Sequence, residues 1–221
     1  NIEGGTVKSI YSPLRVRADS QTENVIANIS GGNIFGRIDH QMSSSTAGVK
    51  GTLNISGGTF TPYGIKNTAI KVFGAGPNTD ASGIVLNISG GKFDAPIEVN
   101  KVDPVALGQG FNEKFITGGT FTVDPSEYVA NGYVAKQNEN SLWTIVPAPA
   151  VVEGGYEISN AAQLKYFAES VNAGETTYNG TTIKLAADID LQNDPWTPIG
   201  FNPNEKAGNE KYYTGTFDGN G

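Results

Sequence analysis

Three arginines and one histidine are the side chains best suited to chemistry in this 221-residue chain. Arg15 and Arg17 are two positions apart, so they share one face if their segment is a strand. Arg37 and His40 follow in the next segment. An imidazole can act as a general base near neutral pH, and guanidinium groups can neutralise carboxylates, as cleavage of an acidic polysaccharide requires. Because no spacing places a nucleophile beside a base, we expect these four residues to form at most a weak ligand site, and we predict no catalytic residue.

Other polar and aromatic residues offer weaker candidates. Asp188 and Asp190 share one face of an expected strand and could bind calcium or hydrolyse a glycoside, but no DxDxDG loop is present and exposure opposite the apolar face explains them without a ligand. Asn78-Thr79-Asp80 matches the first catalytic motif of polygalacturonases, but the companion motifs are absent from the sequence, and we interpret it as a turn in an exposed loop. Trp143 and Trp196 could stack on sugars, but their apolar neighbours predict core positions.

The composition excludes several functional classes. The chain has 15 basic and 22 acidic side chains, a formal net charge of −7, which disfavours binding to the phosphates of nucleic acids. It has no cysteine and one histidine, so disulfides, thiolate metal sites and histidine-rich zinc sites are excluded. No apolar run approaches the roughly 20 residues that a membrane-spanning helix needs. We therefore predict no metal, no cofactor, no nucleic-acid partner and no membrane span.

A six-residue motif repeats five times along the first two thirds of the chain. Its copies are spaced by 27, 26, 33 and 28 residues, which is typical of stacked solenoid units. The spacing of 33 indicates an inserted loop from Gly74 to Gly83. The copies are IEGGTV from Ile2, ISGGNI from Ile29, ISGGTF from Ile55, ISGGKF from Ile88 and ITGGTF from Ile116.

Each position of the motif predicts a stacked column of like residues. The leading isoleucines predict one buried column, and the residues five places later predict a second, namely Val7, Ile34, Phe60, Phe93 and Phe121. The glycine pairs between them permit positive φ and a sharp bend. Asn1, Asn28, Asn54 and Asn87 precede four of the isoleucines and predict a ladder of amide hydrogen bonds.

Two short strands joined by a bend in each repeat predict an all-β fold, specifically a right-handed parallel β-helix. The repeats, followed by DPSEYVANGYVA from Asp124 to Ala135, resemble surface β-helix proteins of gut Firmicutes and Bacteroidetes, described as cell-surface or adhesion proteins with a pectin-lyase-like fold. The resemblance covers residues 1–146, which we expect to form one domain.

A second module is expected after a linker. Residues 147–155, PAPAVVEGG, contain two prolines and two glycines and predict the linker. Ser159 or Asn160 can cap a helix over Ala161–Ala173, with an apolar face at Leu164, Phe167, Ala168 and Val171 and a stop at Gly174. The alternation of TTIKLAADIDL then predicts a strand that continues to Leu191.

Residues 156–221 resemble a second bacterial surface module. The helix, IKLAADIDL, WTPIG from Trp196 and YTGTFDGNG from Tyr213 are similar to the glycine-rich repeat of surface adhesins and of some immunoglobulin-A-cleaving metallopeptidases. In such modules the helix usually caps a solenoid. No HExxH sequence is present, so the peptidase activity is not implied. Since the chain begins inside one repeat and stops where a further strand is due, we expect a fragment of a longer protein.

The resemblances imply a secreted or cell-surface structural protein that presents loops to host or dietary glycans or proteins. The alternative is a polysaccharide lyase or hydrolase, or a carbohydrate-binding module attached to one. Turnover of glycans would distinguish the enzyme from the scaffold. Uncapped solenoid ends would also favour weak self-association.

Overall fold

The computed structural model describes residues 1–18, 24–42, 49–74, 81–101, 107–201 and 212–220. These residues are mostly β-strands with a single α-helix, which confirms the all-β class. Contacts divide the chain into two compact units, the first comprising residues 1–130 with 135–146 and the second residues 131–134 with 147–221. None of the described helices is long and apolar enough to cross a membrane.

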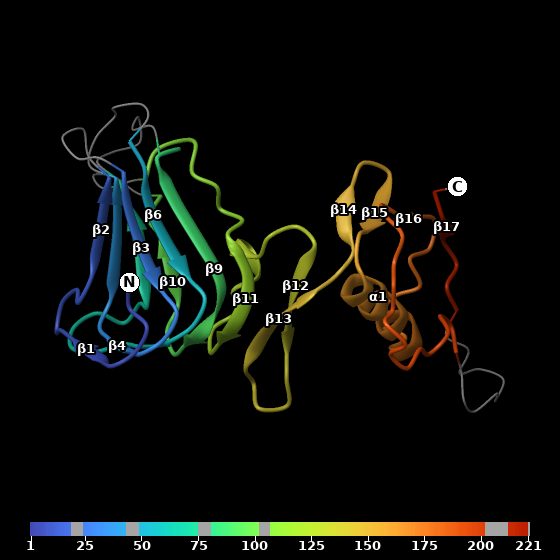
Figure 1. The fold of residues 1–221 in the computed structure, drawn as a ribbon, viewed down its shortest axis with the longest axis horizontal. Coiled ribbons are helices and arrows are strands. Elements are labelled where there is room, and N and C mark those ends of the chain that lie inside the picture. The colour runs from blue at the N-terminus through green and yellow to red at the C-terminus, as the bar shows by residue number, and fades with distance from the viewer. Residues whose placement is uncertain (19–23, 43–48, 75–80, 102–106, 202–211, 221) are drawn as a thin grey trace. The chain divides into compact units, whose positions relative to one another are not determined.

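Two sheets build the first unit, and Figure 1 shows many of their strands side by side in blue to green. In the first sheet, β3 pairs with β6, β6 pairs with β9, and a longer path runs β1-β4-β7-β9-β11-β13-β12. Its strands are β1 (Thr6–Lys8), β3 (Val25–Ile29), β4 (Asn33–Phe35), β6 (Gly51–Ile55), β7 (Thr59–Thr61), β9 (Ile84–Phe93), β11 (Ile116–Phe121), β12 (Tyr133–Gln137) and β13 (Trp143–Pro147). The second sheet has the order β10-β8-β5-β2, with strands β2 (Arg15–Ala18), β5 (Ile38–Met42), β8 (Ile70–Phe73) and β10 (Ile97–Val99).

The leading isoleucines of the repeats stack in register, as predicted. Ile29 is the Cα partner of Ile55, Ile55 of Ile88, and Ile88 of Ile116, all in parallel pairs. These four side chains are at most 1% exposed, and Ile2 joins the column through a parallel bridge to Ile29. The column therefore removes a continuous apolar strip from water, which is the main stabilising term of such a fold.

The second column is also confirmed, and its aromatic members stack face to face. The rings of Phe60 and Phe93 are 4.6 Å apart with an interplanar angle of 8°. The ring centroids of Phe93 and Phe121 are 4.7 Å apart, and the angle between the ring planes is 6°. Val7 and Ile34 extend the column through the parallel pairs of β1 with β4 and β4 with β7. Identical residues at one place in successive repeats thus meet as direct neighbours.

The predicted amide ladder forms along the asparagines. The Nδ2 of each asparagine donates to the Oδ1 of its counterpart in the preceding repeat, Asn28 to Asn1 at 3.0 Å, Asn54 to Asn28 at 2.8 Å and Asn87 to Asn54 at 2.8 Å. All three hydrogen bonds run in one direction, so the amides of Asn28 and Asn54 each donate one bond and accept another. This pattern fixes the pairing register as well as satisfying the amides.

The two glycines of the second to fifth motifs are required for different reasons. The second of each pair has positive φ, for example +93° at Gly58. The first does not, but a Cβ added at Gly57 would lie 2.2 Å from the Ser30 carbonyl oxygen of the preceding repeat. Close approach of two backbones therefore explains the first glycine in the second to fifth motifs, whereas nothing lies within 4 Å of a Cβ added at Gly4 in the first motif.

The repeats end in a change of strand direction. β13 pairs antiparallel with β11, so the first sheet is mixed. Between β11 and β12 the chain forms a short 3-10 helix, η1 (Ser126–Tyr128). The insertion predicted from Gly74 to Gly83 begins and ends at described residues, of which Gly74 and Ala81 are buried, while residues 75–80 lie outside the described part.

The segment predicted as a linker contains regular structure. Within residues 147–155, strand β14 (Ala150–Val152) pairs antiparallel with the start of β15 (Gly155–Ile158). Gly154, at φ +83°, makes the turn between them. Prolines and glycines predicted an irregular segment because they mark turns, but here the prolines precede a short hairpin and the glycines form its turn and the start of its second strand.

The predicted helix of the second unit is confirmed to the residue. α1 (Ala161–Ala173) begins after Asn160, whose side chain accepts a hydrogen bond from the Gln163 backbone, and ends at Gly174 in the left-handed conformation. The Gln163 side chain in turn accepts from the Ser159 backbone at 2.8 Å, which resembles a capping box. Phe167 and Val171 are buried with Ile158 and Ile183 in the core of this unit.

The last predicted strand is shorter than expected. β16 (Thr182–Leu185) pairs parallel with β15, and β17 (Thr216–Asp218) pairs parallel with β16. The alternating pattern reaches Leu191, but β15 offers no partner beyond Ile158 because the chain turns there into α1. Figure 1 shows α1 beside these strands in orange.

Candidate functional site

The structure brings Arg15 and Arg37 together around a carboxylate that the sequence analysis overlooked. Arg15 Nη2 lies 3.1 Å from Asp39 Oδ2, and Arg37 Nε lies 2.7 Å from Asp39 Oδ1. The Ser12 hydroxyl donates to Oδ2 of the same carboxylate at 2.7 Å. The Asp39 side chain is 2% exposed, so its charge is covered by these three partners. Two guanidinium groups thus share one carboxylate, which offsets part of the positive charge that an acidic substrate would need.

Asp39 remains ionised in this environment. Burial alone would raise its pKa, but the hydrogen bonds from Ser12 and Arg37, the positive charge of Arg37 and the hydrogen bond from Arg15 together lower the pKa below its usual value. A carboxylate held in its charged form by two arginines is a poor proton donor. Its role is to position the two arginines.

The same face of the second sheet carries a row of alternating charges. Arg15, Asp39, Lys71 and Glu98 occupy matching positions on β2, β5, β8 and β10. Lys71 Nζ lies 2.5 Å from Glu98 Oε1, so the row contains an ion pair at each end. Opposite charges on neighbouring strands stabilise a sheet modestly and set its register. The structural role explains these residues without a substrate.

His40 does not belong to this cluster, which corrects the grouping expected from the sequence. Successive residues of β5 point to opposite faces, so Asp39 and His40 lie on different sides of the sheet. His40 is fully buried in a column with Val16, Val72 and Val99. Arg37 and His40 are three positions apart, an odd number, so strand alternation places their side chains on opposite faces of the sheet.

The buried histidine is neutral at physiological pH. Its Nε2 lies 3.0 Å from the Gly51 carbonyl oxygen, which assigns the ring proton to Nε2, while Nδ1 has no hydrogen-bond partner among the described residues. Burial lowers the pKa of His40 to about 4, and the bond to Gly51 only partly opposes this. Without access to solvent, this imidazole cannot reach a substrate.

Arg17 is exposed on the same face as Arg15, as predicted, and pairs in register with Gln41. The structure therefore brings Arg15 and Arg37 together, places Arg17 on the same strand and face as Arg15, and buries His40 in the core. That the arginines bind an anionic ligand stays a prediction. The signal for Asp39 was present in the sequence Arg37-Ile38-Asp39, where residues two apart share a strand face.

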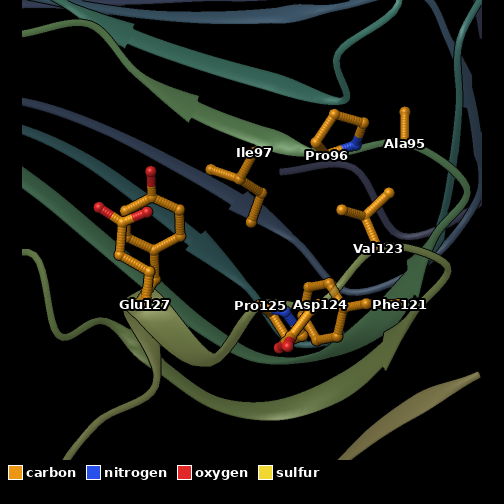
Figure 2. Close-up of a pocket in the computed structure, with 9 residues that line it drawn as sticks. Ala95, Pro96, Ile97, Phe121, Val123, Asp124, Pro125 and Glu127 are labelled. Atoms are coloured by element: carbon orange, nitrogen blue, oxygen red, sulfur yellow. The ribbon is translucent and has the colours of Figure 1, made fainter. Parts of the chain in front are cut away.

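A pocket of about 220 Å³ lies in the first unit, where β10 faces the segment after β11. Figure 2 shows Ile97 and Pro96 on one side of it and Phe121 and Pro125 on the other. The remaining lining residues are Ala95, Val123, Asp124, Glu127 and Tyr128. The walls are apolar, and two carboxylates and a phenol supply the polar groups.

The polar groups of this pocket are already engaged. Asp124 Oδ1 accepts hydrogen bonds from the backbone and hydroxyl of Ser126, at 2.9 and 2.5 Å. Glu127 pairs with Lys101 at 3.3 Å, and the hydrogen bonds to Glu113 and Glu127 raise the pKa of Lys101. Burial raises the pKa of Tyr128, and the charge of Glu127 adds to this effect. The arrangement can accommodate a small apolar group, but it presents no base poised beside a nucleophile.

Trp196 is exposed, contrary to the core position expected from its neighbours. It is 37% exposed and lines a groove of about 180 Å³ with residues of α1. Trp143 is half-buried on β13 and pairs with Phe121. Pro195 and Pro198 flank Trp196 and hold it in an irregular segment, where apolar neighbours in the sequence do not become neighbours in a core.

The other acidic candidates form no site in the described chain. Asp188 and Asp190 are exposed and lie beyond the end of β16, and Asp190 accepts a hydrogen bond from the Gln192 backbone at 2.7 Å. Asn78-Thr79-Asp80 lies outside the described residues. No group of three or more metal-ligating side chains gathers among the residues that the structure describes.

Comparisons of this chain with known protein families, with curated proteins and with solved structures find no match.

Proposed function

We propose that this chain is a non-catalytic structural and binding protein whose repeats coil into a right-handed parallel β-helix. The observation that carries the proposal is the agreement of three columns: isoleucine on isoleucine, phenylalanine on phenylalanine and asparagine on asparagine, in one register through successive repeats. Such a stack grows by adding like units and offers an extended regular surface for binding. Residues 1–146 form this module in our proposal, and residues 156–221 belong to a second one.

The chemistry of the basic residues favours binding over catalysis. A polysaccharide lyase needs a base that reaches the sugar and cations that are free to neutralise a uronate. Here the only imidazole is buried, and two of the three arginines share the Asp39 carboxylate. Among the residues that the structure describes, no observation favours the enzyme alternative.

The resemblance of the repeats to bacterial surface β-helix proteins supports a secreted or cell-surface location and a role in adhesion. The ligands we propose are glycans or proteins of the host or of its diet. Exposed side chains and loops between the strands would make the contacts, because the stacked columns are occupied with holding the scaffold together.

The test is binding without turnover. The full chain would be exposed to immobilised neutral and acidic plant polysaccharides and to mucin, and retention would be measured beside release of reducing sugars and unsaturated uronates. We expect retention on at least one surface and no released product. Turnover abolished by Arg37→Ala or His40→Ala would establish the enzyme instead, and failure to be retained on any surface would contradict the binding role.

A further inference from the structure

We propose that the groove beside Trp196 is a binding subsite for a neutral pyranose ring of a glycan. This inference rests on the proposed function, because it assigns a place and a ligand class to the binding role. Helix α1 supplies one wall through Lys165, Ala168, Glu169 and Asn172, and the segment Pro195–Thr197 supplies the other. At about 180 Å³ the groove is smaller than the roughly 300–1,000 Å³ of pockets for drug-sized ligands, and it suits a single ring.

The segment that carries Trp196 is tied to the helix on both sides. Before it, Asp194 forms an ion pair with Lys165. After it, Asn172 Nδ2 donates to the Pro198 carbonyl and Asn172 Oδ1 accepts from the Phe201 backbone, both at 3.0 Å. A platform fixed in this way loses little conformational entropy when a ligand binds. Exposed tryptophan in an anchored segment is therefore better explained as a contact surface than as a packing defect.

The side chains of the groove match the chemistry of a sugar ring. A pyranose has an apolar C–H face, which can lie against the electron-rich face of an indole ring, and a rim of hydroxyl groups. The Glu169 carboxylate can accept hydrogen bonds from that rim, and bonds to a charged acceptor are the stronger kind. Thr197 adds a hydroxyl that can donate or accept.

The charges of the groove favour a neutral ligand over an anionic one. Asp194 balances Lys165, while Glu169 forms no ion pair with any residue in the described part of the chain. The surplus negative charge opposes a uronate or a sialic acid. A quaternary ammonium, which the face of a tryptophan can also attract, is the competing ligand class in the titration below.

Titration of the full chain with defined probes tests the assignment. Because the chain has two tryptophans, Trp143→Phe leaves Trp196 as the only indole reporter. We expect saturable changes in its fluorescence with β-linked tetrasaccharides of glucose or galactose, and at least threefold weaker binding of tetragalacturonate and of choline. Calorimetry on the unmodified chain should give the same order. Equal or tighter binding of either charged probe, or no binding of the neutral ones, would overturn the inference.

Variants locate the site. Trp196→Ala should weaken binding of the neutral tetrasaccharides at least tenfold, Trp196→Phe should restore most of it, and Glu169→Gln should weaken it about threefold. Glu153→Gln, which removes an exposed carboxylate of the β14–β15 turn, is the matched control and should bind normally. Unchanged melting temperatures would show that the variants fold. Retained glycan binding in Trp196→Ala would reject this groove while leaving the proposed function intact, whereas the panel of surfaces described above judges that function separately.

Discussion

His40 occupies a place in the core that a hydrocarbon side chain could fill. Its neighbours in the column are valines, and only one of its ring nitrogens has a hydrogen-bond partner among the described residues. In the unfolded chain the same imidazole is in water, where it gains a proton below pH 6.5 or so. The difference between the two states makes the stability of the protein depend on pH.

We predict that mild acid destabilises the protein through His40. The folded-state pKa of about 4 is lower than the unfolded value, so the contribution is complete above about pH 6.5 and is lost as the pH falls from there towards 4. The loss should approach about 3 kcal/mol, at about 1.4 kcal/mol for each pKa unit. Urea denaturation between pH 7 and 4 measures it. His40→Val should flatten the pH dependence of the free energy of unfolding between pH 7 and 4. An equally steep loss of stability in that variant would contradict the role assigned to His40.

Asp39 should affect the stability of the protein at lower pH than His40 does. Its pKa is lowered in the folded state, so its contribution is present above the unfolded value of about 3.9 and is lost as the pH falls below it. His40 and Asp39 therefore affect the stability of the protein in separate parts of the pH range.

The first glycine of each motif gives a second test at the residue scale. Gly57→Ala would place a methyl group 2.2 Å from the Ser30 carbonyl oxygen, so the two backbones must separate. We expect a loss of about 2 kcal/mol or more in the free energy of unfolding. Gly4→Ala is the matched control, since nothing lies within 4 Å of the added Cβ at the same motif position. Equal stability of the two variants would show that close backbone approach does not explain this glycine.

At the scale of strands, the isoleucine column is the element on which the register depends. Ile55→Ala should cost about 2–5 kcal/mol because it leaves a cavity between Ile29 and Ile88. Ile26→Ala removes a side chain of the same type from β3 that is 64% exposed, and it should change stability by less than about 0.5 kcal/mol. Melting of both variants with the unmodified protein would contradict the buried column.

The elements that could be predicted are those whose signal is local or repeated. The columns follow from identical residues recurring at one motif position, and α1 follows from Asn160, its apolar face and Gly174. The end of β16 could not be predicted, because it depends on where the partner strand β15 stops. The hairpin β14–β15 was missed for a similar reason, since prolines and glycines do not reveal a pairing partner.

The candidate site was predicted less well than the fold. The arginines could be identified from the sequence as candidate ligand-binding residues. The pairing of Arg15 with Asp39 could not, because it joins two strands that are distant in the sequence and follows no repeated motif. The separation of Arg37 from His40 could have been inferred from strand alternation. Exposure of Trp196 could not, because it depends on how an irregular segment packs against α1.

For the whole molecule, we propose that successive repeats stack in one fixed register and so build a binding scaffold. The cysteine-free chain allows this to be tested by paired substitution. Thr52 on β6 and Val85 on β9 are Cα partners, whereas Thr52 and Asn87 are offset by two residues. Neighbouring strands are roughly 4.8 Å apart, within the Cα separations that a disulfide can bridge, and the offset pair lies beyond about 7 Å.

The most direct measurement is therefore disulfide formation in the two double variants under mild oxidation, followed by mass spectrometry of proteolytic fragments. Stacking in this register predicts that Thr52→Cys with Val85→Cys forms the bond in nearly all molecules, and that Thr52→Cys with Asn87→Cys forms the bond in few. Preferential bonding of the offset pair, or none in either, would contradict the stacked register on which the fold and the proposed function depend.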